Sequence, residues 1–178
     1  MEKRKNKKRA DLTEKLKSGD MRTIRSAIGH IRKEGALEDI PGIIAALRQQ
    51  ERDIIRKEIQ TLLCDIRIAG SQEYIINGIK DPINDGIKAE LLSVCWESQQ
   101  DYTQYLEVFI SAFLNSGYRP SLEAFTVIEK IFLDYEMPSD KLAQTIEIIK
   151  ASYPDLSENK RQLALVLLDS LENAGGPE

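Results

Sequence analysis

Residues 53–66 read Asp-Ile-Ile-Arg-Lys-Glu-Ile-Gln-Thr-Leu-Leu-Cys-Asp-Ile. Apolar residues recur along this segment at steps of four, three and four, a spacing that places their side chains on one face of an α-helix. The residues of this apolar face are Ile55, Ile59, Leu62 and Ile66. The segment therefore predicts an amphipathic helix that buries this face against neighbouring elements.

The same apolar face is repeated earlier and later in the chain, at intervals of 31 and 32 positions. The earlier copy consists of Ile24, Ile28 and Ile31, and the later copy consists of Ile87, Leu91 and Val94. In every copy the residue after the first apolar one is basic, and these residues are Arg25, Arg56 and Lys88.

A second apolar pattern, between these copies, repeats with the same period. It consists of Ile43, Ile44 and Leu47, which recur at the later positions Ile75, Ile76 and Ile79. Leu12 and Leu16 are the earlier counterparts of Ile43 and Leu47. Because both alternating helices repeat, the sequence predicts an α-helical solenoid, in which helix pairs stack and bury a continuous core.

Glycine, proline and polar residues separate the predicted helices. Asp20 is expected to be a helix N-cap, Ile40-Pro41 to start a helix, and Gly117 with Pro120 to break one. The fold class is therefore all-α, an α-α superhelix of about five stacked antiparallel helix pairs in one domain over residues 11–173. Helices are expected over residues 11–17, 21–33, 52–69, 85–98, 102–115, 122–135, 141–152 and 158–173, with others around 43–47 and 75–79.

Residues 20–31 read Asp-Met-Arg-Thr-Ile-Arg-Ser-Ala-Ile-Gly-His-Ile. The segment resembles the second helix of a HEAT repeat, with an Asp, an aliphatic–Arg pair, an Ala and further aliphatic residues at helical spacing. Residues 53–59 are similar, and residues 87–91 form a weaker copy. The periods of 31 and 32 are nearer to the short bacterial variety of the repeat. The resemblance covers residues 11–98, and after residue 98 only helix pairs of suitable length continue it.

The resemblance implies a curved superhelix whose second helices line a concave face, with Asp and Arg side chains tying adjacent repeats together. It implies that Arg25, Arg56 and Lys88 are such structural residues, with a ligand-binding role as the alternative. The face suits a helix or peptide of a partner protein. The candidate binding residues on this face are Arg25, Arg56, Glu58, Lys88, Glu90 and Trp96.

Charged residues are distributed unevenly along the chain. Residues 1–33 contain 12 Lys and Arg against 4 Asp and Glu, whereas residues 34–178 contain 13 against 25. Residues 1–10 are expected to form a disordered basic arm, and residues 174–178 a frayed tail. The arm either increases solubility as a charged tail, or binds nucleic-acid phosphates, or binds an anionic membrane surface. Its basic residues are Lys3, Arg4, Lys5, Lys7, Lys8 and Arg9.

No motif in the sequence indicates catalysis, and neither a cofactor nor a metal is expected. The chain contains no phosphate-binding glycine loop, nucleophile elbow or metal-binding His pair. His30 is its one histidine, which leaves every other part without the commonest general base. Cys64 and Cys95 are expected to be reduced and packed. No apolar run reaches the roughly 18 residues of a membrane span, so a cytoplasmic location is expected.

Nine of the eleven aromatic residues lie between positions 96 and 135, which predicts a dense core there. Alternatively, Trp96 and Tyr102 reach the surface as a recognition patch. The C-terminal helix carries Leu163, Leu165, Val166, Leu167, Leu168 and Leu171 on more than one face. It is therefore expected to be buried against the body or to form a homodimer contact.

The favoured function is a non-catalytic protein–protein interaction scaffold. An acidic body predicts a partner with a basic or helical segment. The alternative is a nucleic-acid-associated protein tethered by the basic arm. More distant is a DNA glycosylase, since some of these enzymes resemble HEAT solenoids; Trp96 with Glu58, Glu90 or Glu97 would then recognise an alkylated base. The acidic body argues against the basic groove that such an enzyme needs.

Overall fold

The computed structural model describes residues 10–174. The predicted arm lies outside this range except for Ala10, and the predicted tail except for Ala174. Every regular element of the described residues is a helix, which confirms the all-α prediction. None of these helices combines the length and the apolar character needed to cross a membrane. The chain divides into two compact units, residues 1–100 and 101–178, and the boundary lies where the 31- to 32-residue register ends.

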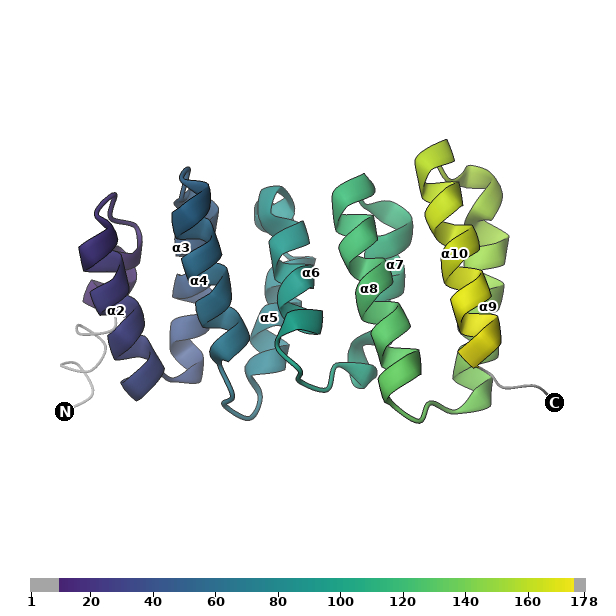
Figure 1. Ribbon diagram of the computed structural model, residues 1–178, viewed down its shortest axis with the longest axis horizontal. Coiled ribbons are helices and arrows are strands. Elements are labelled where there is room, and N and C mark those ends of the chain that lie inside the picture. Colours follow the sequence, from purple (N-terminus) through teal and green to yellow (C-terminus); the bar gives the residue numbers. More distant parts are fainter. Residues whose placement is uncertain (1–9, 175–178) are drawn as a thin grey trace. The chain divides into compact units, whose positions relative to one another are not determined.

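Unit 1 contains a helix over residues 10–16 and five longer helices (Figure 1). The longer helices are α2 (Met21–Glu34), α3 (Ile40–Gln49), α4 (Asp53–Asp65), α5 (Ser71–Lys80) and α6 (Lys88–Glu97). The short 3₁₀ segment η1 (Leu37–Asp39) leads into α3, and η2 (Pro82–Ile87) leads into α6.

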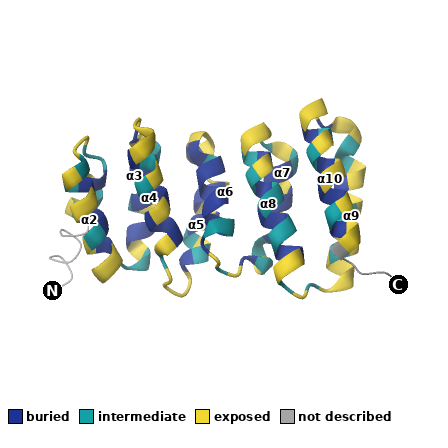
Figure 2. Cartoon of the chain, viewed as in Figure 1, coloured by how far each residue is buried: buried dark blue, intermediate teal, exposed yellow. Residues whose placement is uncertain are grey.

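The helices of unit 1 pack in the order that the two apolar patterns predict. Helix α4 packs against α2, α3 and α6, while α5 packs against α3 and α6. Ile55, Ile59 and Leu62 of α4 are at most 1% exposed, so the repeated apolar face is the core of the unit. Figure 2 shows this division between a buried and an exposed face along α4.

The ends of α2 and α3 follow from local sequence. The Asp20 carboxylate accepts hydrogen bonds from the Thr23 hydroxyl at 2.6 Å and the Thr23 backbone N–H at 2.8 Å, which confirms the predicted N-cap. These two bonds, the hydroxyl first, lower the pKa of Asp20. Helix α3 begins at Ile40 with Pro41 in its first turn, where a missing N–H leaves no hydrogen bond unmade.

Helix α4 ends at Asp65, four residues before the predicted end at residue 69. Ile66 has an extended conformation, and its carbonyl accepts a hydrogen bond from the Gln100 amide at 3.0 Å. The Arg67 guanidinium donates to the Cys64 carbonyl. Side chains from outside the helix thus satisfy carbonyls at its C-terminus, and the helix stops although the local sequence would continue it.

Unit 2 consists of two helix pairs. Helix α8 packs against α7 and α10, and α9 packs against the same two helices. The 3₁₀ segments η3 (Thr103–Tyr105) and η4 (Tyr153–Asp155) precede α7 and α10. The helices are α7 (Leu106–Asn115), α8 (Tyr118–Asp134), α9 (Ser139–Ser152) and α10 (Glu158–Ala174).

The prediction that Pro120 breaks a helix is wrong. Helix α8 begins at Tyr118, so Pro120 lies in its first turn. The first backbone N–H groups of a helix have no partner within it, and a proline there removes no intrahelical bond. The helix consequently begins four residues earlier than residue 122.

The predicted aromatic core is formed in part. Of the nine aromatic residues between positions 96 and 135, Tyr102, Phe109, Phe113 and Phe132 are buried, whereas Tyr118 is 50% exposed. Phe109 and Phe113 are fully buried, and Tyr102 is 2% exposed. The rings of Tyr102 and Phe109 meet edge to face with their centroids 6.1 Å apart. The alternative of a surface recognition patch is therefore wrong for Tyr102, whereas Trp96 is half-buried.

A buried lysine holds the C-terminus of α7. Lys160 of α10 is 7% exposed, and its ammonium donates to the Leu114 carbonyl at 2.6 Å and the Ser116 carbonyl at 3.0 Å. The Ser121 hydroxyl donates to the Phe113 carbonyl at 2.8 Å. These donors satisfy carbonyls that the helix itself leaves unpaired.

Replacing Lys160 with methionine is expected to lower the free energy of unfolding by about 2 kcal/mol, because two carbonyls lose their buried donor. Burial lowers the pKa of Lys160 from 10.5. Between the pKa of Lys160 in the native state and 10.5, the native state becomes more stable as the pH rises. The difference in the free energy of unfolding between wild type and Lys160→Met should therefore grow with pH in that range. Urea titrations of both proteins measure this. Lys150→Met, which removes an exposed lysine paired with Glu172, is the control and should unfold close to the wild-type midpoint.

Candidate interaction surface

Helices α2, α4 and α6 of unit 1 are joined by polar side chains as well as by the apolar core. Between α2 and α4, the Arg25 Nη2 lies 2.8 Å from the Glu58 Oε1 and the Arg32 Nη2 lies 2.5 Å from the Asp65 Oδ2. The Arg25 Nε donates to the same Glu58 oxygen at 3.2 Å. Two arginines of α2 therefore hold two carboxylates of α4, one near each end of the contact.

Between α4 and α6 a further ion pair, Arg56 with Glu90, is largely removed from solvent. The side chain of Arg56 is 22% exposed and that of Glu90 is 8% exposed. By contrast, the Arg25 side chain is 62% exposed and that of Glu58 is 30% exposed. The same arginine position of the repeat thus forms a solvated pair in one copy and a mostly buried pair in the next.

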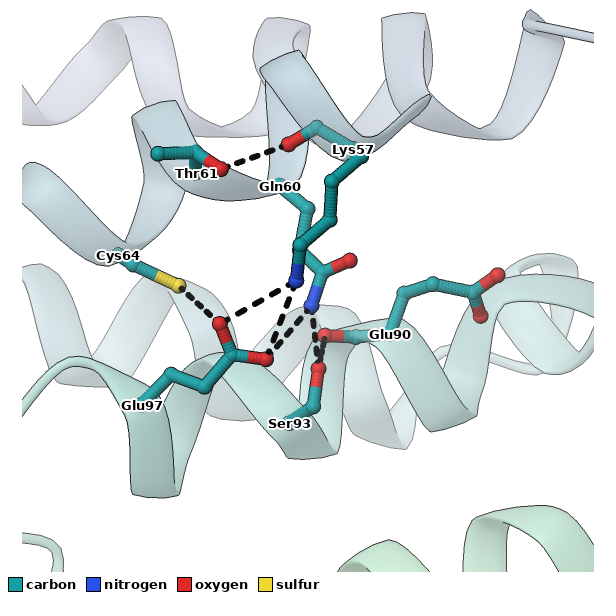
Figure 3. A network of polar contacts seen from close by, with 7 residues as sticks. All are labelled: Lys57, Gln60, Thr61, Cys64, Glu90, Ser93 and Glu97. Carbon is teal, nitrogen blue, oxygen red and sulfur yellow. Dashed lines mark hydrogen bonds and ion pairs between the residues drawn. The ribbon is translucent and has the colours of Figure 1, made fainter. Parts of the chain in front are cut away.

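A second cluster between α4 and α6 centres on the Glu97 carboxylate (Figure 3). The Gln60 amide donates to Glu97 at 3.1 Å and to the Ser93 hydroxyl at 2.6 Å. The Lys57 ammonium lies 3.4 Å from the carboxylate, and the Cys64 thiol lies 3.9 Å from it. This cluster and the ion pairs above all lie on α2, α4 and α6, and we call these residues together the polar network of the α2–α4–α6 face.

The partners in this network follow a fixed sequence offset. Each arginine bonds a carboxylate two residues beyond the position that the 31- to 32-residue register makes equivalent to it. Arg25 is equivalent to Arg56 but bonds Glu58, and Arg56 is equivalent to Lys88 but bonds Glu90.

The network departs from the prediction at Lys88. Lys88 does not bond another second helix: its ammonium lies 2.6 Å from the Asp85 carboxylate, three residues earlier in its own segment. By contrast, Arg25 joins α2 to α4, and Arg56 joins α4 to α6.

Four residues of this face were not predicted from the sequence. Arg32, Lys57, Gln60 and Asp65 each have a partner 33 to 40 residues away. A search for oppositely charged or hydrogen-bonding residues about 33 positions apart finds the pairs Arg25–Glu58, Arg32–Asp65 and Gln60–Ser93. The period of the apolar face sets this distance, so the signal was present in the sequence.

The side chains of this face suit the recognition of a partner rather than a chemical reaction. Cys64 and Cys95 are free and buried, as predicted. Burial, and to a lesser extent the Glu97 carboxylate, raises the pKa of Cys64 to about 12, so its thiol is protonated at neutral pH. His30 is exposed, away from both cysteines in sequence. Within residues 10–174 no cluster of His, Cys, Asp and Glu has the arrangement of a metal site.

Comparison with protein-family models, with curated proteins and with solved structures finds no match to this chain.

Proposed function

We propose that the chain is a HEAT-like α-solenoid that acts as a non-catalytic protein–protein interaction scaffold and binds its partner on the α2–α4–α6 face. The observation that carries this proposal is the polar network itself. Its ion pairs hold charged groups of both signs at fixed positions on rigid helices. The proposal includes a cytoplasmic location and no cofactor.

Fixed charges favour recognition because their rotamers are already restricted. A side chain held by an ion pair loses less conformational freedom on binding than a free one, by up to about 1 kcal/mol for each long side chain. Lys57 and Arg25 are each 62% exposed, and Asp65 is 46% exposed, so these three remain accessible to a partner. The mostly buried Arg56–Glu90 pair is then a structural element rather than a contact.

The arrangement of charge suggests the form of the partner. Helix α2 contributes an excess of cations, whereas α4 and α6 contribute the carboxylates of Glu58, Asp65 and Glu97. A helical segment laid across the three helices would place basic side chains over α4 and α6. This agrees with a partner that contains a basic or helical segment.

The test compares the proteins retained by full-length wild type with those retained by the double variant Glu58→Gln/Asp65→Asn. Binding to the α2–α4–α6 face predicts that specific partners are lost from the variant, because a basic segment loses both carboxylates. The matched control is Glu73→Gln, an exposed acidic residue of α5. Circular dichroism establishes that each variant is folded. Equal retention by all three proteins would exclude this face as the binding surface.

A second candidate function, nucleic-acid association through the basic arm, is favoured by the excess of Lys and Arg over Asp and Glu in residues 1–33. Arg22 and Arg25 of α2 are exposed and extend this basic character into the described helices. The test is titration of labelled duplex DNA and RNA with the full chain and with a chain lacking residues 1–10, at low and physiological salt. Salt-sensitive binding that disappears with the arm would support this function; no binding at low salt would reject it.

A further inference from the structure

Helix α10 presents an apolar strip to solvent. Leu167 and Leu171 are at most 1% exposed and pack into unit 2, but Leu165 is 48% exposed and Val166 is 57% exposed. The helical period places Leu165 and Val166 on one side together with four polar residues, all exposed. The residues of this α10 outer face are Glu158, Gln162, Leu165, Val166, Asp169 and Asn173.

Unit 1 carries a hollow of complementary character. It has a volume of about 320 Å³ and lies between the helix of residues 10–16 and α2. Leu12 contributes apolar surface, Lys15 and Arg22 contribute cations, and the His30 imidazole also lines the hollow, whereas Ala27 beneath it is 1% exposed. Lys15 shares its charge with Asp11 at 2.6 Å, so Arg22 is the principal cation. We call this site the α2 hollow.

The α2 hollow and the α2–α4–α6 face use different residues of α2. At about 100° per residue, Arg25 and Arg32 lie about 140° to 160° around the helix from His30, whereas Arg22 lies between the two sides. None of the residues that line the hollow takes part in the contacts of the α2–α4–α6 face, so a ligand in one does not need the side chains of the other.

We propose that the α10 outer face of one molecule docks into the α2 hollow of a second molecule, so that the chain associates head to tail. Leu165 and Val166 would cover Leu12, and Asp169 would lie near Arg22. The charge balance of the described residues favours this occupant: residues 10–33 contain 6 Lys and Arg against 3 Asp and Glu, whereas residues 101–174 contain 6 against 12. Opposite charges of this size attract across the interface and speed association.

This arrangement differs from a two-fold dimer through α10 alone. In a two-fold contact the same patch meets itself, which would place Glu158 and Asp169 of one copy near those of the other. Two acidic patches repel, so the acidic strip disfavours that dimer. A head-to-tail contact uses two different patches, each of which remains available on one end of the assembly and can bind another copy.

The first measurement is sedimentation equilibrium of the full-length protein over a concentration series. At low salt, with a Debye length of about 30 Å, the average mass is expected to rise with concentration. Near 1 M salt, where the Debye length is about 3 Å, association should weaken by roughly tenfold or more. A mass that stays at that of the monomer at every concentration and at low salt would overturn the proposal.

Two substitutions each disable one patch. Val166→Lys places a cation opposite the basic hollow, and Arg22→Glu places a carboxylate opposite the acidic strip. Each is expected to weaken association at least about tenfold, because like charges then meet at the interface. The matched controls are Leu133→Lys, which changes an exposed leucine of α8, and Lys80→Glu, which changes an exposed lysine of α5. Both controls should associate as wild type does, and circular dichroism confirms that all four variants are folded.

Mixing the two disabled variants shows whether the contact is head to tail or a two-fold contact through α10. The Val166→Lys protein keeps its hollow and the Arg22→Glu protein keeps its α10 outer face, so a mixture can form one contact. It is expected to give one-to-one heterodimers and nothing larger, while each variant alone stays monomeric. If Arg22→Glu alone associates like wild type, the contact is a dimer through α10. If the mixture stays monomeric, the two patches do not bind each other. Either result rejects the head-to-tail contact.

Discussion

Replacing Arg56 with methionine is expected to lower the free energy of unfolding by about 3 kcal/mol, because the substitution leaves the buried Glu90 carboxylate without its cation. The side chains of Arg56 and Glu90 are 22% and 8% exposed, so little water can replace the lost partner. The Arg56 guanidinium also donates to the Gln50 carbonyl at 3.2 Å, and that hydrogen bond would be lost as well. Urea unfolding followed by circular dichroism measures the change.

Arg25→Met is the matched control, since Arg25 occupies the equivalent position of the preceding repeat. Its side chain is 62% exposed, and breaking such a pair usually costs less than about 1 kcal/mol. The double variant Arg56→Met/Glu90→Met should recover most of the stability lost by Arg56→Met, because it removes the uncompensated charge as well. Equal losses for Arg56→Met and Arg25→Met would show that burial does not distinguish the two pairs.

The Cys64 thiol is expected to react about a thousandfold more slowly in the native protein than an ordinary cysteine. Its pKa is raised from 9.0 to about 12, first by burial and then by the nearby Glu97 carboxylate, which reduces the thiolate present at pH 8 by that factor. The measurement is the rate of disulfide exchange with an aromatic disulfide reagent in a Cys95→Ala variant, where Cys64 is the one remaining thiol.

Two comparisons test the cause of this protection. The same variant unfolded in urea should react at the rate of a free cysteine, because unfolding removes both the burial and the carboxylate. Adding Glu97→Gln to the folded variant should raise the rate by a smaller factor, since burial, the larger cause, persists. A native rate equal to the rate in urea would contradict the raised pKa.

The core of unit 1 could be predicted from the sequence because its apolar faces repeat. Ile55, Ile59 and Leu62 recur at helical spacing, and all are buried. The capping of α2 by Asp20 was also predictable, because its carboxylate bonds a residue only three positions away. Interactions of this kind depend on the order of nearby residues and on the helical period, both of which the sequence states directly.

The candidate site was less accessible to sequence analysis. Arg25, Arg56 and Lys88 share one position in the pattern, yet the first is solvated, the second is mostly buried and the third bonds its own segment. The choice depends on which carboxylate the neighbouring helix presents and on how much of the pair that helix covers. Pattern alone treats the three residues as equivalent.

The amino-acid order by itself determined the all-α class, the 31- to 32-residue register and the apolar faces, because helix period and side-chain polarity act over one or two turns. The tertiary structure alone decided where α4 ends, how deeply Arg56 is buried, that Cys64 loses its acidity and that Lys160 holds the end of α7. These properties arise from groups that lie far apart in the sequence, and their desolvation depends on the packing of whole helices against one another.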